Sequence, residues 1–400
     1  MTEYEVRDSF ERYGATAYFD AQRNPLAIDR FAHNTEKTDF HNAPGVDVDA
    51  NGVRKYKYIQ RSLPGGEDPT WEHAKWAVKV SVMTEITLID HLLWAHLTVS
   101  NGVTKASREA LSPSNAIRQL LKPFTYRANT INFSAYKTLF AVGGMADHWF
   151  GFTRTDLGKY MERCSQSFKF KEVKSFLDVL GLPLDNMEYL KTNAPLVADG
   201  VRLHQAFVNF ATDYINWAYA NDGDLANDAE AVDYWNKLQN SRCNGDLDGT
   251  NRCDSSMGNK YKFGLGSLTK ENLAKQLAHL MFYVTGYHRV IGNFADYLES
   301  GSKTLACVIR PGKDEATVLD YFGVSTLAAF TGFPQINLVN DWRHVFVGAS
   351  GAKKASLDAL LEKWQKELRD LSMTIEAENT ARSIHQHMMN PRHLDSSIAI

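Results

Sequence analysis

The sequence predicts a mostly α-helical protein built as one large domain. Long segments carry apolar residues at helical spacing, strand-like segments are few, and no internal repeat, low-complexity tract or clear linker interrupts the chain. With 400 residues, of which 44% are hydrophobic and 12% aromatic, the chain can bury a large core. We therefore expect long helices packed around one another, with little β-structure.

Six segments carry the helical pattern. Gly143 and Gly144 interrupt the second of them, and Ser267 or Thr269 is a suitable N-cap for the fifth. Strand-like patches are limited to residues 55–60 and 305–309. The helical segments are residues 71–96, 129–148, 200–220, 224–240, 269–298 and 355–382.

The N-terminal part differs in composition from the rest. Residues 1–68 are polar and contain turn signals such as HNAPGVD and LPGGEDP, whereas helical patterning begins near residue 69. We expect residues 1–68 to wrap around a helical body formed by residues 69–400.

Two histidines lie in the most apolar part of the first helical segment. His91 and His96 are surrounded by leucines, and a buried imidazole costs free energy unless its nitrogens find partners. Residues five apart point about 140° apart on a regular α-helix. A local π-bulge would bring them toward one face, and such bulges are frequent at functional sites. The residues alone leave two interpretations open: satisfied core histidines, or a functional pair.

A second group of histidines stands near the end of the chain. His385 and His387 are two residues apart, with His393 following. On a helix, positions two apart point about 200° apart. We expect a solvated face here rather than a second metal site.

Charge and cysteine content limit the function classes. The net charge is -3, from 44 basic and 47 acidic residues, so there is no electrostatic basis for binding nucleic acid. No signal peptide and no membrane-spanning segment is evident, which predicts a soluble, cytoplasmic protein. Cys243 and Cys253 bracket a polar loop and could pair only in an oxidising compartment.

Several blocks, in order, resemble the lipoxygenase family. PTWEHAKWAVKVSVMTEITLIDHLLWAHL resembles the family's long iron-binding helix, and SLTKENLAKQLAHLMFYVTGYHRVIGNFADYL resembles its second ligand helix. ADGVRLHQAFVNFATDYINWAY and the final HLDSSIAI also resemble family segments, so the resemblance spans about residues 69–400. It implies a compact helical lipoxygenase-like domain without the family's N-terminal β-barrel domain.

The resemblance implies a non-heme iron site, with two registers open on the first helix. The family uses two histidines spaced H-x4-H. A gapless count places these positions at Ile86 and His91, whereas the spacing itself places them at His91 and His96.

The second helix and the last residue supply the remaining implied ligands. His288 matches the family histidine, Gly292 stands where an asparagine or histidine is expected, and Asn293 follows it. The α-carboxylate of Ile400 matches the terminal ligand. Two imidazoles and one carboxylate already form a recognised set for Fe(II). The implied set is His91, His288 and Ile400, completed by His96 and Asn293.

The implied function is oxygenation of an unsaturated or otherwise oxidisable apolar small molecule by dioxygen. Ile86 and Gly292 depart from the ligand pattern, which favours a specialised metabolite over a common fatty acid. Iron is the expected metal, with manganese as an alternative. The rival hypotheses are a non-catalytic protein that binds an apolar ligand and an enzyme that holds heme in the same pocket.

Overall fold

The computed structural model divides into two compact units, each assembled from three stretches of chain. Unit 1 comprises Met1–Asp90, Ser134–Ser165 and Asn293–Gly332, and unit 2 comprises His91–Phe133, Gln166–Gly292 and Phe333–Ile400. The residues that the structure describes are 1, 3–20, 24–31, 56–60, 69–168, 170, 182–239, 263, 265–292, 308–310, 317–320, 322–323, 326, 336–382 and 385–398.

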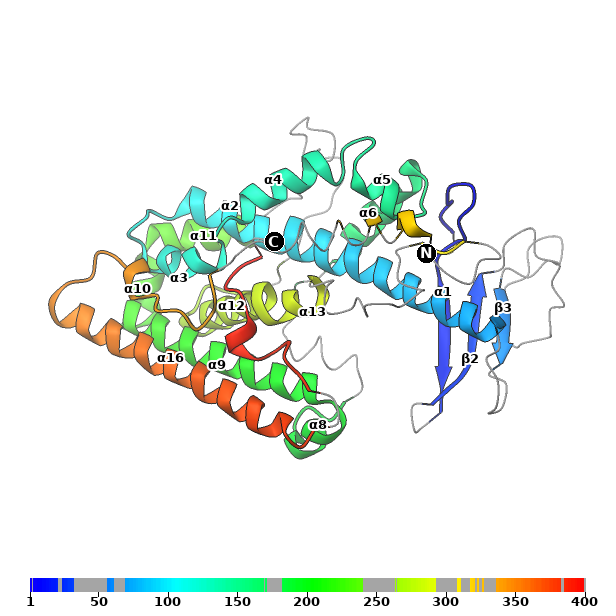
Figure 1. Cartoon of the computed structure of the whole chain (residues 1–400). Helices are drawn as coiled ribbons and strands as arrows, with labels where there is room; N and C mark the ends of the chain where they lie inside the picture. Colours follow the sequence, from blue (N-terminus) through cyan, green and yellow to red (C-terminus); the bar gives the residue numbers. More distant parts are fainter. Residues whose placement is uncertain are drawn as a thin grey trace. The chain divides into compact units, whose positions relative to one another are not determined.

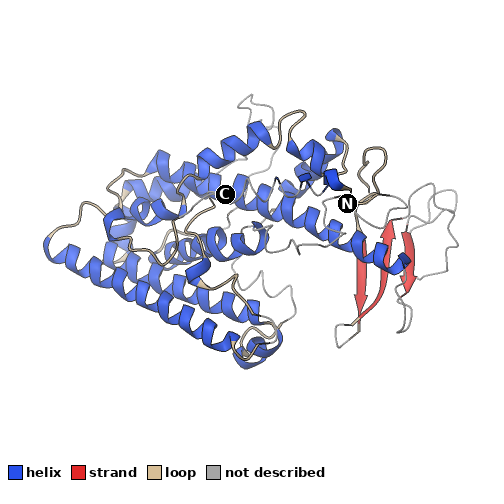
Figure 2. Ribbon diagram, viewed as in Figure 1, coloured by secondary structure: helices blue, strands red, loops and turns tan. Residues whose placement is uncertain are grey.

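Unit 1 contains a three-stranded antiparallel sheet in the order β1-β2-β3. Its strands are β1 (Ala15–Phe19), β2 (Pro25–Phe31) and β3 (Tyr56–Gln60). Helix α1 (Pro69–Glu85) contacts all three strands, as Figures 1 and 2 show. Trp71 and Ala74 of α1 form a small core with Ile28 of β2, which fixes the helix on the sheet.

A buried carboxylate ties the N-terminal segment of unit 1 to the sheet and to α1. Glu11 is 2% exposed, accepts a hydrogen bond from Arg30 at 3.1 Å and lies 2.8 Å from the Nε2 of His73. A buried charge needs such partners to offset its desolvation. Unit 1 also contains helix α5 (Met145–Trp149) and nearly all of helix α6 (Arg154–Ser167).

The core of unit 2 is formed around helix α9 (Pro195–Ala218), which packs against α12 (Lys270–Phe282) and α16 (Gly351–Asn379). Phe210 of α9 stacks on Trp364 of α16 with ring centroids 4.0 Å apart. The fully buried Asp199 accepts hydrogen bonds from both terminal nitrogens of Arg382, at 2.8 and 3.0 Å. Apolar and paired polar contacts therefore hold these helices together.

Two helices widen into π-helix. Helix α1 is followed by η1 (Ile86–Ser100), and α12 is followed by η3 (Tyr283–Tyr287) and α13 (His288–Gly292). The other helical elements are α2 (Asn101–Ala110), α3 (Ala116–Phe124), α4 (Ala128–Thr138), α8 (Met187–Asn193), α10 (Asp222–Asn227), α11 (Ala229–Gln239), η4 (Arg343–Val345) and η5 (Pro391–His393).

The predicted mostly α-helical fold class is confirmed, because helices dominate the described residues. The Oγ1 of Thr269 accepts a hydrogen bond from the backbone of Asn272, as expected of an N-cap. Strands β1 and β2 were not predicted, and β1 is mostly exposed and short. Val308 and Ile309 do not lie in a strand, while residues 305–307 fall outside the described residues.

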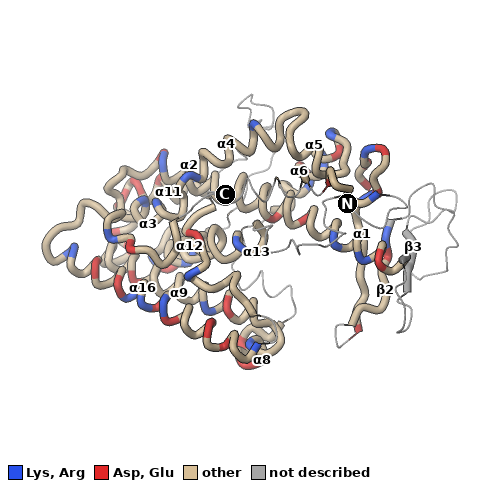
Figure 3. Tube along the Cα trace, in the orientation of Figure 1, with Lys and Arg blue, Asp and Glu red and all other residues tan. Residues whose placement is uncertain are grey.

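The predicted division at residue 68 stays a prediction, although the sheet of residues 15–60 shares unit 1 with α1. The loop with Cys243 and Cys253 lies outside the described residues. Among the described helices, none combines the length and apolar character needed to cross a bilayer. Figure 3 shows acidic and basic residues interspersed along α16, which includes the pairs Lys354–Asp358 and Lys366–Asp370. Mixed charge of this kind is typical of a solvated helix face.

Candidate metal centre

The π-helix η1 brings His91 and His96 to the same face. Backbone hydrogen bonds in a π-helix run from residue i to i+5, so residues five apart lie one above the other. The hydroxyl of Thr98 follows the same spacing, donating to the carbonyl of Leu93 at 2.7 Å. The predicted π-bulge is therefore present, extended to 15 residues.

His288 at the start of α13 completes a cluster with these two histidines, which we call the buried trio. The three Nε2 atoms of His91, His96 and His288 lie 3.0 Å from one another. The three residues are between 2% and 3% exposed. Three mutually perpendicular metal–nitrogen bonds of about 2.1 Å would place their nitrogens about 3.0 Å apart. The spacing thus suits three adjacent positions around one metal ion.

The buried trio is held in the neutral form that binds metals. Burial, together with the neighbouring imidazoles, holds the pKa of His91 well below its usual value, and burial does the same for the pKa of His288. Burial lowers the pKa of His96 to about 4, against the opposing effect of its hydrogen bond with Asn132. Near neutral pH the imidazoles are uncharged, which leaves nitrogen lone pairs available.

Asn132 of α4 sets the tautomer of His96. Its Oδ1 lies 2.9 Å from the Nδ1 of His96, and an amide oxygen only accepts hydrogen bonds, so Nδ1 carries the proton. The amide nitrogen of Asn132 donates to the backbone carbonyl of His96 at 3.0 Å and to Asn101 at 2.6 Å. The Nε2 of His96 therefore presents its lone pair to the other two histidines.

Gly292, one turn after His288, lies directly against the buried trio. A Cβ atom at this position would stand 2.6 Å from the Nε2 of His91 and 3.1 Å from the Nε2 of His288. Real Cβ atoms essentially never approach so closely. The backbone at Gly292 thus occupies the place beside the cluster where the family pattern has a ligand side chain.

The structure separates the predicted ligands into three groups. It brings His91, His96 and His288 together, and these form the one group of metal-ligating type found among the described residues. Ile86 carries no metal-binding atom in its side chain, and the pair that meets His288 is His91 and His96, which have the H-x4-H spacing. Asn293 and Ile400 fall outside the described residues. Asn132 was not identified from the sequence, although it stands in TINFSA (residues 130–135), a further segment that resembles one of the family.

The fold and the buried trio together define a helical protein with a candidate non-heme metal centre. A model of the lipoxygenase family matches residues 53–304. The chain therefore belongs to the lipoxygenase family, which confirms the resemblance seen in the sequence.

Individual relatives agree with this assignment. The chain is 23% identical over 370 residues to a linoleate 9/13-lipoxygenase of Pseudomonas aeruginosa, covering 82% of this chain and 48% of the relative. It is 28% identical over 196 residues to linoleate 9S-lipoxygenase 1 of Hordeum vulgare, covering 45% of this chain and 22% of the relative. The chain thus spans about half the length, or less, of the curated relatives it matches.

Solved structures show the same fold. A lipoxygenase variant crystallised with arachidonate has a TM-score of 0.75 at 19% identity, covering 96% of this chain and 54% of that one. A calcium-dependent 11R-lipoxygenase has a TM-score of 0.74 at 17% identity, covering 99% and 56%. At these identities the likeness shows the fold.

Proposed function

We propose that the chain is a lipoxygenase-like non-heme iron oxygenase that acts on an unsaturated apolar small molecule. The single observation that carries this proposal is the buried trio, whose three Nε2 atoms lie 3.0 Å apart. Imidazole nitrogens suit iron as well as several other transition metals, and the family assignment favours iron.

Each residue of the centre has a separate task in this proposal. His91, His96 and His288 hold the metal, and Asn132 keeps His96 in the tautomer that can bind it. Fully buried apolar residues of η1, such as Leu88 and Ala95, keep water away from that part of the helix. When bound, non-heme iron supplies the one-electron chemistry that couples substrate oxidation to dioxygen.

Gly292 supports a substrate that differs from a common fatty acid. The family pattern has a ligand side chain here, whereas the backbone of Gly292 lies directly against His91 and His288. Gly292 itself supplies no ligand atom from a side chain, so in this proposal that side of the centre has more room for a substrate or for water unless Asn293 binds the metal. The relatives are described as linoleate lipoxygenases, so linoleate is the reference compound against which a specialised metabolite is compared.

The C-terminal tail supports the proposed carboxylate ligand. Leu394 and Ile398 are fully buried, and the backbone N–H of Ser396 donates to the carbonyl of Ile336 at 2.8 Å. The tail is thus fixed in unit 2 up to two residues before Ile400. The roles of Ile400 and Asn293 stay predictions.

Heme fits the centre poorly, because an axial heme ligand is a single imidazole facing the porphyrin plane. Three Nε2 atoms within 3.0 Å of one another leave no room for a porphyrin between them. The remaining rival is a non-catalytic binding protein, and Gly292 favours it as much as it favours altered catalysis.

Elemental analysis of the purified full chain tests the proposal. We expect one iron per chain in the wild type, almost none in His96→Gln, and one in the control His387→Gln, which alters an exposed histidine. A chain extended by one residue after Ile400 should bind less iron if the terminal carboxylate is a ligand. Wild-type protein without a transition metal, or His96→Gln with unchanged metal, contradicts the proposed centre.

Oxygen uptake separates the catalytic proposal from the binding rival. The iron-loaded chain is supplied with linoleate and with a panel of other polyenes. We expect oxygen uptake with at least one polyene of the panel, and slower uptake with linoleate than with that polyene. Ligand binding without oxygen uptake across the panel supports the binding protein instead.

A further inference from the structure

A cavity of about 350 Å³ lies within unit 1, separate in sequence from the buried trio. Three segments line it: the N-terminal residues Arg7 and Phe10, helix α5, and residues 308–326. Its volume falls in the range of about 300 to 1,000 Å³ that small-molecule sites occupy. None of the metal-centre residues contributes to its lining.

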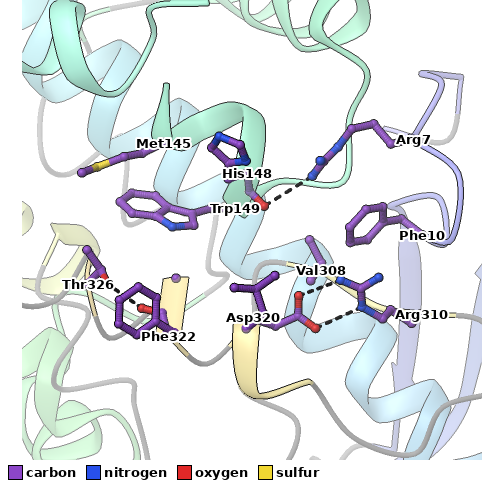
Figure 4. Close-up of a pocket in the computed structure, with 12 residues that line it drawn as sticks. Arg7, Phe10, Met145, His148, Trp149, Val308, Arg310, Asp320, Phe322 and Thr326 are labelled. Carbon is purple, nitrogen blue, oxygen red and sulfur yellow. Dashed lines mark hydrogen bonds and ion pairs between the residues drawn. The ribbon is translucent and has the colours of Figure 1, made fainter. Parts of the chain in front are cut away.

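One side of the cavity is cationic. The guanidinium carbons of Arg7 and Arg310 lie 4.7 and 4.4 Å from the ring centroid of Phe10. Figure 4 shows these three residues together on one side, with Asp320 beside Arg310. Cation–π contacts hold both charges in place next to an aromatic face.

Asp320 is fully engaged and compensates only one of the two arginines. It accepts hydrogen bonds from Nε and Nη2 of Arg310, at 3.1 and 2.9 Å, and from both the backbone and the hydroxyl of Thr317. These bonds leave its oxygens poorly placed to recruit a metal or organic cation. The lining therefore keeps a surplus of one positive charge.

Arg7 carries that surplus charge. Its Nη2 donates to the backbone carbonyls of His148 and Phe150, at 3.3 and 2.8 Å, and it has no carboxylate partner within the described part of the chain. Its Nε is buried without a hydrogen-bond acceptor. The backbone carbonyls therefore fix the guanidinium in place, while its positive charge stays uncompensated by the described residues.

The opposite side of the cavity is apolar. Figure 4 shows Met145, Trp149 and Phe322 on this side. The indole of Trp149 lies tightly against the backbone of Gly323, where a Cβ atom would stand 2.6 Å from the indole Cδ1. The absence of a side chain at residue 323 therefore allows the indole to lie this close to the backbone.

We propose that this cavity binds a small amphipathic monocarboxylate. The carboxylate lies against the positively charged guanidinium of Arg7, and the apolar part packs against Trp149, Met145 and Phe322. One surplus positive charge suits a monoanion better than a di- or triphosphate. A neutral apolar ligand would leave the charge of Arg7 uncompensated.

Calorimetric titration of the full chain with 4-phenylbutyrate tests the proposal, with the neutral 4-phenylbutyramide as the matched probe. We expect one carboxylate bound per chain, and at least about tenfold weaker binding of the amide because a charge-assisted hydrogen bond is lost. Arg7→Gln should weaken the carboxylate to the level of the amide. Arg163→Gln, at an exposed arginine of the same unit, should change neither.

Two variants of opposite charge at Leu319 keep the proposal testable if Arg7→Gln folds poorly. Leu319 lines the cavity yet is 73% exposed, so substitutions there should not disturb packing. We expect Leu319→Glu to weaken and Leu319→Lys to strengthen carboxylate binding by about two- to fivefold, with no change for the amide.

Three results overturn the proposal: no carboxylate binding at millimolar concentration, equal binding of acid and amide, or equal effects of the two Leu319 variants. Titration of His288→Gln separates this site from the metal centre. Unchanged carboxylate binding in that variant supports the cavity, whatever the fate of the proposed iron. Abolished binding with retained fold assigns the ligand to the metal centre and refutes the cavity site.

Discussion

The chain contains two groups of three histidines, and only one of them has the geometry of a metal site. In the buried trio the ring centroids lie 4.7 to 5.0 Å apart, and in the surface trio of His385, His387 and His393 they lie 5.7 and 6.2 Å apart. The centroid distances differ by only about an ångström. What differs is burial and the direction of the nitrogens, since all three surface residues are exposed.

The contrast shows that closeness of imidazoles does not by itself make a site. In the buried trio, two helices fix the rings before a metal arrives, and burial keeps them neutral. In the surface trio, each ring is hydrated and a metal would have to order mobile side chains at an entropic cost. Preorganisation distinguishes the two groups.

The largest expected effect is the loss of bound iron when one histidine of the buried trio is removed, compared with removal of the surface trio. We expect His288→Gln to reduce bound iron from about one per chain to near zero, because the two remaining imidazoles hold the metal much more weakly. A triple variant, with His385, His387 and His393 all changed to alanine, should keep its iron. Elemental analysis after desalting gives both values, with circular dichroism confirming the fold. Loss of iron from the surface variant would contradict the assignment of the metal to the buried trio.

The next largest effect should follow from adding a methyl group beside the buried trio. Gly292→Ala places a Cβ atom 2.6 Å from the Nε2 of His91, so the imidazole of His91 must move from its position in the buried trio. We expect iron affinity to fall by about 100-fold, measured by competition with a chelator. Gly158→Ala is the matched control, since a Cβ atom there would meet nothing within 4 Å. Equal affinities for the two variants would show that Gly292 does not limit the geometry.

A smaller effect is expected from the hydrogen bond that orients His96. Asn132→Ala leaves all three imidazoles in place but removes the acceptor at Nδ1 and the tie to the backbone of His96. We expect about 10-fold weaker iron binding, the low end of what losing such a supporting contact costs. Asn209→Ala, at an exposed asparagine of α9, serves as control. An unchanged affinity in Asn132→Ala would mean that η1 alone orients His96.

The same contrast explains how far sequence reasoning reached. Helical periodicity predicted the long helices, and the spacing of His91 and His96 predicted a π-bulge, because both features are local. The ligand register was left open, since counting from flanking blocks favoured Ile86, and only the fold shows that His91, His96 and His288 meet. Asn132 was missed because its contact with His96 joins residues 36 positions apart. Strand β1 was missed because its stability depends on pairing with β2 rather than on its own pattern.

His279 provides a third case: a buried histidine, 6% exposed, that stands outside the trio. Both ring nitrogens are buried without a hydrogen-bond partner in the described structure. Phe170 and Tyr283 pack against the ring, with centroids 4.3 and 5.9 Å away. Burial, with a contribution from His204, lowers the pKa of His279 to about 3.

This histidine should make the fold sensitive to acid. Its pKa is about 6.5 in the unfolded chain and lower in the folded one, so the unfolded chain takes up a proton first as pH falls. The contribution of His279 to stability is retained above pH 6.5 and lost progressively below it, by about 2 kcal/mol between pH 7 and pH 5. His279→Leu should remove this contribution, while the buried trio and His204, whose pKa values burial also lowers, keep theirs. Urea unfolding at both pH values measures it, with His387→Leu as the exposed control. If His279→Leu kept the full acid sensitivity, the pKa of His279 would not be lowered in the folded chain. The folded chain would then hold the protonated ring as well as water does, unlike the neutral imidazoles of the buried trio.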